Sequence, residues 1–304
     1  APDCVLCFWG VAMCFATNIN YNIENQLALN AAAQKAASLA VRQRLTDKSV
    51  KLIAGVQALV AQPPAKGNVS AFASAMCGNF VPDNISDPDV ASVCAGAAMA
   101  MTPWHYYEGV PEGMRFPLRK SLLPVKNLLF EHIQGSDGPH ALAIHLLIHL
   151  LEPTNAPEGY RWQAVDATQK LYSSHGNALV PAQGHLTHMP AHMFLRVGRY
   201  ASGATTAMRS IANNQRYLAQ CLNPYGYGHN IKMLIAHARF AGMSALALQG
   251  AQNATTFEAG EQITPNGAQI CLDCAGEGSP EVVLTLARFA RWREVLVEPI
   301  PAHW

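Results

Sequence analysis

Hydrophobic residues recur along most of the chain three or four positions apart, which is the spacing of α-helices. Alternating runs of β-branched residues, which are typical of strands, are missing from the sequence. Gly, Pro and Asn residues separate the periodic segments and mark turns. The pattern therefore predicts an all-α protein, with helices over 3–17, 26–46, 48–62, 70–78, 87–101, 118–134, 139–152, 158–174, 188–197, 200–220, 229–241, 244–257, 280–290 and 291–297.

Three short turns join predicted helices in the C-terminal half. The first is Val197-Gly198-Arg199-Tyr200, and the small residues Gly203 and Ala207 follow it where two helices must approach closely. Weaker copies lie at 241–243 and 289–295, so the turns are 44 and 48 residues apart. A tetratricopeptide repeat has about 34 residues. We therefore expect a degenerate tetratricopeptide-like array of helical hairpins, an α-solenoid with inserted loops.

The distribution of the histidines divides the predicted array into three parts. Eight of the twelve lie between positions 140 and 229. We expect one array over 1–304, made of N-terminal helices (1–135), a His-rich metal-binding core (136–240) and C-terminal repeats (241–304).

A first group of candidate ligands lies on the helix predicted over 139–152. His145, His149 and Glu152 project from one face of that helix. Two imidazoles four residues apart can bind one metal ion. The zinc-protease pattern HExxH is absent because Leu146 occupies the position of its Glu. Glu152 could be a ligand, an orienting group, a base or a plain helix-end carboxylate.

A second group comprises His185, His188 and His192, with spacings of three and four residues. Pro190 fits the first turn of a helix that carries His192, so the other two histidines could lie on that helix or in the segment before it. His229 follows a Gly-rich turn, and the next residue, Asn230, could supply a further nitrogen.

So many imidazoles among apolar residues predict a transition-metal site, because buried ring nitrogens that make no bond cost about 1–3 kcal/mol each. The candidate ligands exceed the four positions of one tetrahedral ion, so we expect more than one ion or an outer layer of imidazoles. Imidazole ligands, with Met189 and Met193 nearby, favour copper, and zinc is the alternative.

Composition removes several classes of function. Half of the residues are hydrophobic and 13% are charged, so the chain can form a core. The net charge is +1 and basic residues form no run, which argues against a nucleic-acid partner. No apolar run reaches the roughly 18–20 residues of a membrane span, and we interpret Cys4–Ala16 as a packed helix.

The eight cysteines bear on the compartment. Cys77 and Cys94 have a spacing compatible with a disulfide between two antiparallel helices. The pairs Cys4/Cys7 and Cys271/Cys274 are interpreted as disulfides or packed thiols. With N-glycosylation sequons at positions 68, 84 and 253, the cysteines favour an extracytoplasmic or secreted glycoprotein.

The motifs together resemble those of a family of uncharacterised tetratricopeptide-repeat proteins, mostly of bacterial type, over nearly the whole chain. The matching segments are Cys4-x-x-Cys7-Phe8-Trp9-Gly10, Asn18-Ile19-Asn20, Pro103-Trp104, His140-x4-His145-x3-His149-x2-Glu152, Gly184-His185-x2-His188-Met189-Pro190-x-His192 and His229-Asn230. The resemblance implies that His140 belongs with the other ligands. It also implies further hairpins on either side, so that this chain would be a core fragment. Ala290 departs from the usual turn Gly.

These features predict a metal-binding protein, with His140, His145, His149, His185, His188, His192, His229 and Glu152 as the candidate ligands. The first hypothesis is a copper-dependent oxidoreductase. The alternatives are a zinc-dependent enzyme, or an interaction scaffold with a structural ion that binds a peptide or a second copy of the chain through Trp104, Tyr106 and Tyr107. The sequence leaves open whether the protein is an enzyme and which small molecule or peptide it binds.

Overall fold

The regular elements of the protein are helices. The computed structural model describes residues 2–20, 23, 25–61, 68–78, 85–108, 117–134, 139–152, 164–165, 167–169, 171, 179–222, 224, 226–259 and 280–299. In these ranges only one isolated antiparallel bridge, between Tyr107 and Leu118, accompanies the helices. The predicted all-α class is confirmed. None of the helices in these ranges has both the length and the apolar character needed to cross a membrane.

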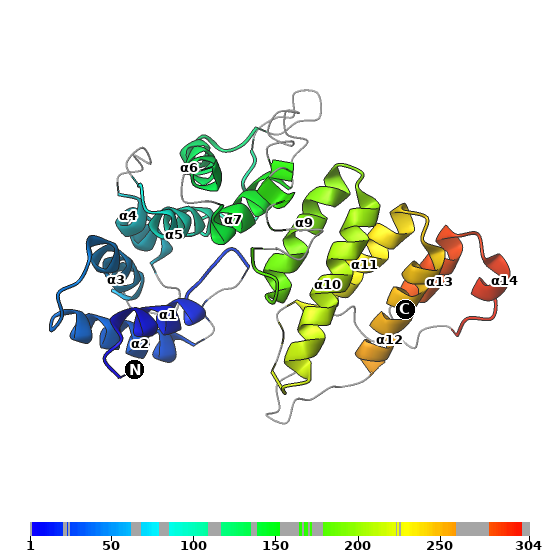
Figure 1. Ribbon diagram of the computed structural model, residues 1–304, viewed down its shortest axis with the longest axis horizontal. Helices are drawn as coiled ribbons and strands as arrows, with labels where there is room; N and C mark the ends of the chain where they lie inside the picture. The colour runs from blue at the N-terminus through cyan, green and yellow to red at the C-terminus, as the bar shows by residue number, and fades with distance from the viewer. Residues whose placement is uncertain are drawn as a thin grey trace. The chain divides into compact units, whose positions relative to one another are not determined.

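The chain forms two compact units, Ala1–Tyr160 and Arg161–Trp304 (Figure 1). Their boundary falls inside the segment 136–240 that the sequence marks as the His-rich core. The predicted helix over 158–174 lies largely outside the described residues, as do Cys271 and Cys274. Each unit is described by itself.

In the N-terminal unit, helices that follow one another in the chain pack against one another. Its elements are α1 (Val5–Phe15), α2 (Gln26–Ala40), α3 (Asp47–Val60), α4 (Val69–Cys77), α5 (Pro88–Met99), the 3-10 helix η2 (Lys120–Leu122), α6 (Leu123–Gln134) and α7 (Ala141–Leu151). A disulfide between Cys77 and Cys94 joins α4 to α5, as predicted. It adds a covalent link to the apolar packing of these two helices.

The C-terminal unit is a series of helical hairpins (Figure 1). Its elements are α9 (Gly184–Arg196), α10 (Tyr200–Leu218), α11 (Tyr227–Phe240), α12 (Ser244–Ala259), α13 (Glu281–Arg288) and α14 (Trp292–Val295). Small residues let α9, α10 and α11 approach one another, and Ala191, Ala204 and Ala207 form one apolar cluster with Met233 and Leu234.

The three predicted hairpin turns share one backbone geometry. Gly198, Gly242 and Ala290 each adopt a positive φ, of 74°, 74° and 54°. In each turn the next residue donates its N–H to the carbonyl five positions earlier, at 2.9 Å from residue 199 to 194, 2.9 Å from 243 to 238 and 3.0 Å from 291 to 286. This is the hydrogen bond of a Schellman C-cap. The recurrence shows that α9/α10, α11/α12 and α13/α14 are joined by turns of the same geometry.

Candidate metal centre

Helix α9 carries three of the predicted ligands on one continuous helix. It begins at Gly184, four residues before the predicted start, because the Gln183 side chain accepts a hydrogen bond from the N–H of Leu186 and caps the helix. Pro190 is therefore inside the helix rather than in its first turn. Proline has no N–H, so it leaves the carbonyl of residue 186 without its usual helical bond.

Polar side chains of α10 fix the first turns of α9. The Ser210 hydroxyl donates to the Gly184 carbonyl at 2.7 Å, and the Asn213 amide donates to the Pro181 carbonyl at 2.9 Å. A Cβ atom at Gly184 would lie 1.9 Å from the Asn214 side-chain oxygen, so glycine lets this side chain approach the start of α9 without having to move. These contacts hold the histidines of α9 in register with α10.

The fourth ligand of this unit comes from α11. Gly226 precedes this helix in the left-handed conformation, with φ 69° and ψ 30°, which favours glycine. His229 lies in the first turn and is half-buried. The Gly-rich turn identified in the sequence therefore brings the start of α11 to the histidines of α9.

His188, His192 and His229 converge in space. Each offers a ring nitrogen, and these nitrogens all lie within 4.8 Å of one another. The Nε2 atoms of His192 and His229 are 3.2 Å apart. The ring centroid of His188 lies 5.2 Å from that of His192 and 4.9 Å from that of His229. We call these three residues the histidine triad; it could hold a metal ion.

Two of the three triad residues are buried, and His229 is half-buried. His188 is 1% exposed and His192 is 7% exposed, and the neighbouring Met189 and Met193 are buried. Asn230, which follows His229, is also fully buried, and neither polar atom of its amide has a hydrogen-bond partner in the described part of the chain. The sequence identified this amide as a further candidate ligand, and its burial fits that role.

His185 adjoins the triad on α9. Its ring centroid lies 4.7 Å from that of His188, with the two rings nearly perpendicular. It can therefore serve as a further ligand or as an outer imidazole that orients His188.

His237 supports the triad and was missed by the sequence analysis. Its Nε2–H donates to the Ala191 carbonyl at 3.0 Å, between His188 and His192 in the chain. Burial lowers the pKa of His237 below its usual value, so the ring stays neutral. Its position eight residues after His229, two turns along α11, was the only signal available in the sequence.

The N-terminal unit holds a separate pair of predicted ligands. His145 and His149 lie one turn apart on α7, with ring centroids 4.7 Å apart. The Trp104 indole meets the buried His149 edge-on at 5.0 Å. Within this unit the pair offers two of the four ligands that a tetrahedral ion takes. The two histidine groups make it plausible that the protein binds more than one ion.

His140 and Glu152 lie at the two ends of α7. His140 is the N-cap, and its Nδ1 atom accepts from the N–H of Ala143 at 3.3 Å and lies 2.9 Å from the Ser92 hydroxyl. Its Nε2 atom lies 2.9 Å from an Asp89 carboxylate oxygen. Both ring nitrogens thus have protein partners in α5 and α7 of the N-terminal unit. Glu152 is the C-cap.

The chain was compared with protein-family models, curated proteins and solved structures, and no match was found in any of the three.

Proposed function

We propose that the C-terminal unit binds a copper ion through His188, His192 and His229. The observation that carries this proposal is the convergence of three ring nitrogens, from two helices, within 4.8 Å. Three histidines provide the kind of nitrogen donors that bind copper and zinc in proteins.

The spacing of the nitrogens supports a shared ion. A tetrahedral ion about 2.0–2.1 Å from each imidazole nitrogen keeps its ligands roughly 3.3 Å apart. The 3.2 Å between the Nε2 atoms of His192 and His229 is close to that value. The other separations between ring nitrogens, up to 4.8 Å, shorten to about 3.3 Å through small rotations of the side chains.

The choice of copper rests on charge and softness. Neutral imidazoles leave the whole charge of the ion in a buried region, and this costs less for monovalent Cu(I) than for Zn²⁺. The buried thioethers of Met189 and Met193 lie next to the ligands in the chain and are soft donors that suit Cu(I). The two bonded cysteine pairs fit an oxidising, extracytoplasmic compartment.

Three protein ligands leave one tetrahedral position for a water molecule or a substrate, which is the arrangement of catalytic sites. With copper, this position supports electron transfer to a small molecule, and hence an oxidoreductase. Zinc in the same three-histidine set is the second candidate, because zinc would activate a bound water molecule there. His185 lies beside the triad and decides whether the fourth position is open. If His185 binds the ion, the site is closed and the ion is structural; if it does not, the open position favours an enzyme.

The repeated Schellman turns support a tetratricopeptide-like array as the framework of this site. The scaffold hypothesis receives less support from the aromatic residues. Tyr106 is fully buried, and the Tyr107 hydroxyl donates to the Leu150 carbonyl at 2.5 Å, so Trp104 is the only one of the three that is largely exposed. A peptide or a second copy of the chain as partner remains the alternative function.

The test is a copper titration of the wild-type chain and of His192→Gln, read against a competing chelator. We expect the variant to lose one equivalent of copper, or to bind it at least about 100-fold more weakly, because one of three ligands is gone. Glutamine keeps a polar side chain of similar size, so the fold should be retained.

His105→Gln is the matched control, since His105 is exposed and lies in the N-terminal unit. Equal affinities for wild type and both variants would contradict the proposed site. The variant His185→Gln distinguishes a catalytic ion, which has an open position, from a structural ion, whose positions are all filled by the protein. An unchanged affinity leaves an open position and supports an enzyme, whereas a loss comparable to that of His192→Gln indicates a closed site.

A further inference from the structure

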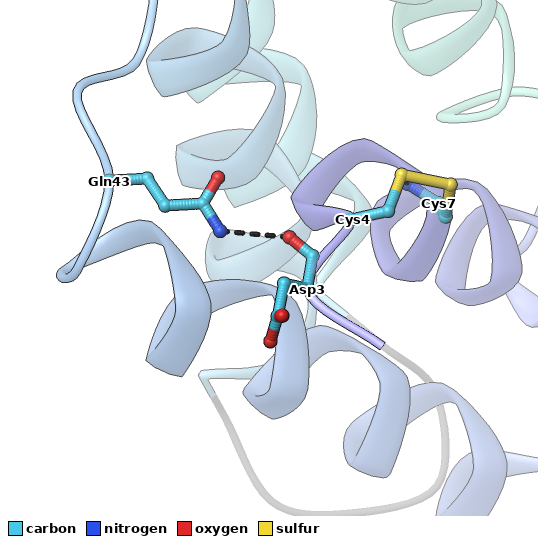
Figure 2. Close-up of a disulfide and its surroundings, with 4 residues drawn as sticks. All are labelled: Asp3, Cys4, Cys7 and Gln43. Atoms are coloured by element: carbon cyan, nitrogen blue, oxygen red, sulfur yellow. Dashed lines mark hydrogen bonds between the residues drawn. A yellow bond between two sulfur atoms is a disulfide. The ribbon is translucent and has the colours of Figure 1, made fainter. Parts of the chain in front are cut away.

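The two disulfides of the N-terminal unit differ in what they connect. Cys77–Cys94 joins two helices, is buried at both ends and spans 17 positions of the chain. Such a cross-link restricts the unfolded chain and holds helices together. Cys4–Cys7 spans three positions and stays within the first turn of α1 (Figure 2).

The Cys4–Cys7 bond therefore contributes little as a cross-link. The loop that it closes is among the shortest possible, and the entropy that a cross-link removes from the unfolded chain is smaller for shorter loops. The segment before α1 is already held in another way, because the Gln43 side-chain amide donates to the Asp3 carbonyl at 2.8 Å (Figure 2). Another role for this bond is needed.

The two sulfur atoms have different surroundings. Cys7 is exposed to solvent, whereas Cys4 is half-buried and is the N-cap residue of α1. The Cys4 Sγ atom accepts a hydrogen bond from the backbone N–H of Cys7 at 3.2 Å. A helix N-terminus stabilises negative charge, and the first turn of α1 carries no acidic residue, although Asp3 precedes it.

We propose that Cys4–Cys7 is a redox-active site that exchanges electrons with small thiols such as glutathione. Three features of the pair support it: an exposed residue, Cys7, whose sulfur a thiolate can attack, a leaving sulfur at a helix N-terminus, and a closed loop so short that the bond adds little stability as a cross-link.

The exchange takes place in two steps. The thiolate of one glutathione attacks the exposed Sγ atom of Cys7, the S–S bond breaks, and its electron pair leaves on the Sγ atom of Cys4. A second glutathione thiolate attacks the glutathione sulfur of the mixed disulfide and releases Cys7 as a thiolate. Two thiols are oxidised to glutathione disulfide, the protein disulfide gains two electrons, and the two thiol protons pass to the cysteines.

The experiment uses the full chain with the background substitution Cys14→Ser, because Cys14 is a free, exposed cysteine on the same helix. The folded protein is incubated with reduced glutathione at neutral pH and quenched with an alkylating agent. Mass spectrometry then follows each disulfide. We expect Cys4–Cys7 to be reduced at least about 100-fold faster than Cys77–Cys94, and to re-form with glutathione disulfide. Equal rates, or reduction only in denaturant, would overturn the proposal.

A second measurement tests whether the pKa of the Cys4 thiol is lowered at the helix N-terminus, or whether the disulfide reacts only because it is exposed. In a Cys7→Ser variant, the alkylation rate of Cys4 should reach half of its maximum at least one pH unit below the value of about 8.5 for an ordinary cysteine. If this variant does not fold, the same profile is recorded on the reduced Cys14→Ser protein. A half-maximum near pH 8.5 would show an ordinary cysteine pair and refute the proposed role.

Discussion

At the scale of single residues, the triad depends on a contact between Gly203 and His237. The His237 ring packs against the backbone of α10 at Gly203, and a Cβ atom there would lie 2.0 Å from the ring. From this position the ring donates its hydrogen bond to the Ala191 carbonyl of α9. Glycine at 203 thus lets one imidazole hold the helix that carries two residues of the triad.

Gly203→Ala should destabilise the C-terminal unit by about 1–3 kcal/mol, because either the ring or the helix must move. Urea unfolding measures the change. Gly96→Ala is the matched control, since its Cβ atom would meet only Leu146, at an ordinary 3.6 Å. That control should be neutral or stabilising by up to about 1 kcal/mol, the gain in helix propensity. Equal effects of the two substitutions would contradict the close packing.

At alkaline pH, the stability of the N-terminal unit depends on Tyr106. Burial raises the pKa of its phenol from 10.0 to about 12. The unfolded chain ionises first as the pH rises, so the stability is fully present below pH 10 and is lost between pH 10 and 12. The loss amounts to at most about 3 kcal/mol.

Urea unfolding between pH 9 and 12 tests this dependence. Tyr106→Phe should remove the alkaline loss of stability, whereas Tyr217→Phe, a change at an exposed tyrosine of the other unit, should keep it. If the wild type and Tyr106→Phe lose stability in parallel over this range, the assignment to Tyr106 is wrong.

At the scale of helices and turns, the three Schellman turns explain why the hairpins were readable in the sequence. Gly198 and Gly242 mark a backbone conformation that other residues adopt only with strain, so the letters of the sequence report the geometry directly. Ala290 adopts the same conformation without being glycine. Alanine in place of the usual glycine therefore raises the free energy of that turn without changing its backbone conformation.

Ala290→Gly should therefore stabilise the C-terminal unit by about 0.5–1 kcal/mol, because glycine accepts a positive φ without steric cost. Ala241→Gly is the matched control in the neighbouring hairpin. Ala241 has φ −76°, so glycine there only adds freedom to the unfolded chain and should destabilise. Thermal unfolding measures both, and shifts of the same sign would contradict the strain at Ala290.

Other features of the helices could not be read from the sequence. The start of α9 depends on a cap by Gln183, a residue type outside the usual Ser, Thr, Asp and Asn, so the prediction placed Pro190 in the first turn. His140 is a candidate ligand through the family resemblance alone; its ring caps α7 and contacts Asp89, and its role as a ligand stays a prediction. The sequence shows which residues can bind a metal and does not show which of them have other partners.

At the scale of the whole molecule, the chain is two units, and the predicted ligands are divided between them. His145 and His149 belong to the first unit, and the histidine triad and His185 belong to the second. Hydrophobic periodicity continues across the boundary, and one array over 1–304 with a His-rich core stays a prediction. A division of this kind depends on tertiary contacts, which periodicity does not report.

The central claim is that His188, His192 and His229 bind one ion. Anomalous diffraction from crystals of the copper-loaded protein, recorded at the copper edge, tests it most directly. We expect an anomalous peak about 2.0–2.2 Å from one ring nitrogen of each of the three histidines. Copper bound elsewhere, with no anomalous peak beside these three rings, would contradict it.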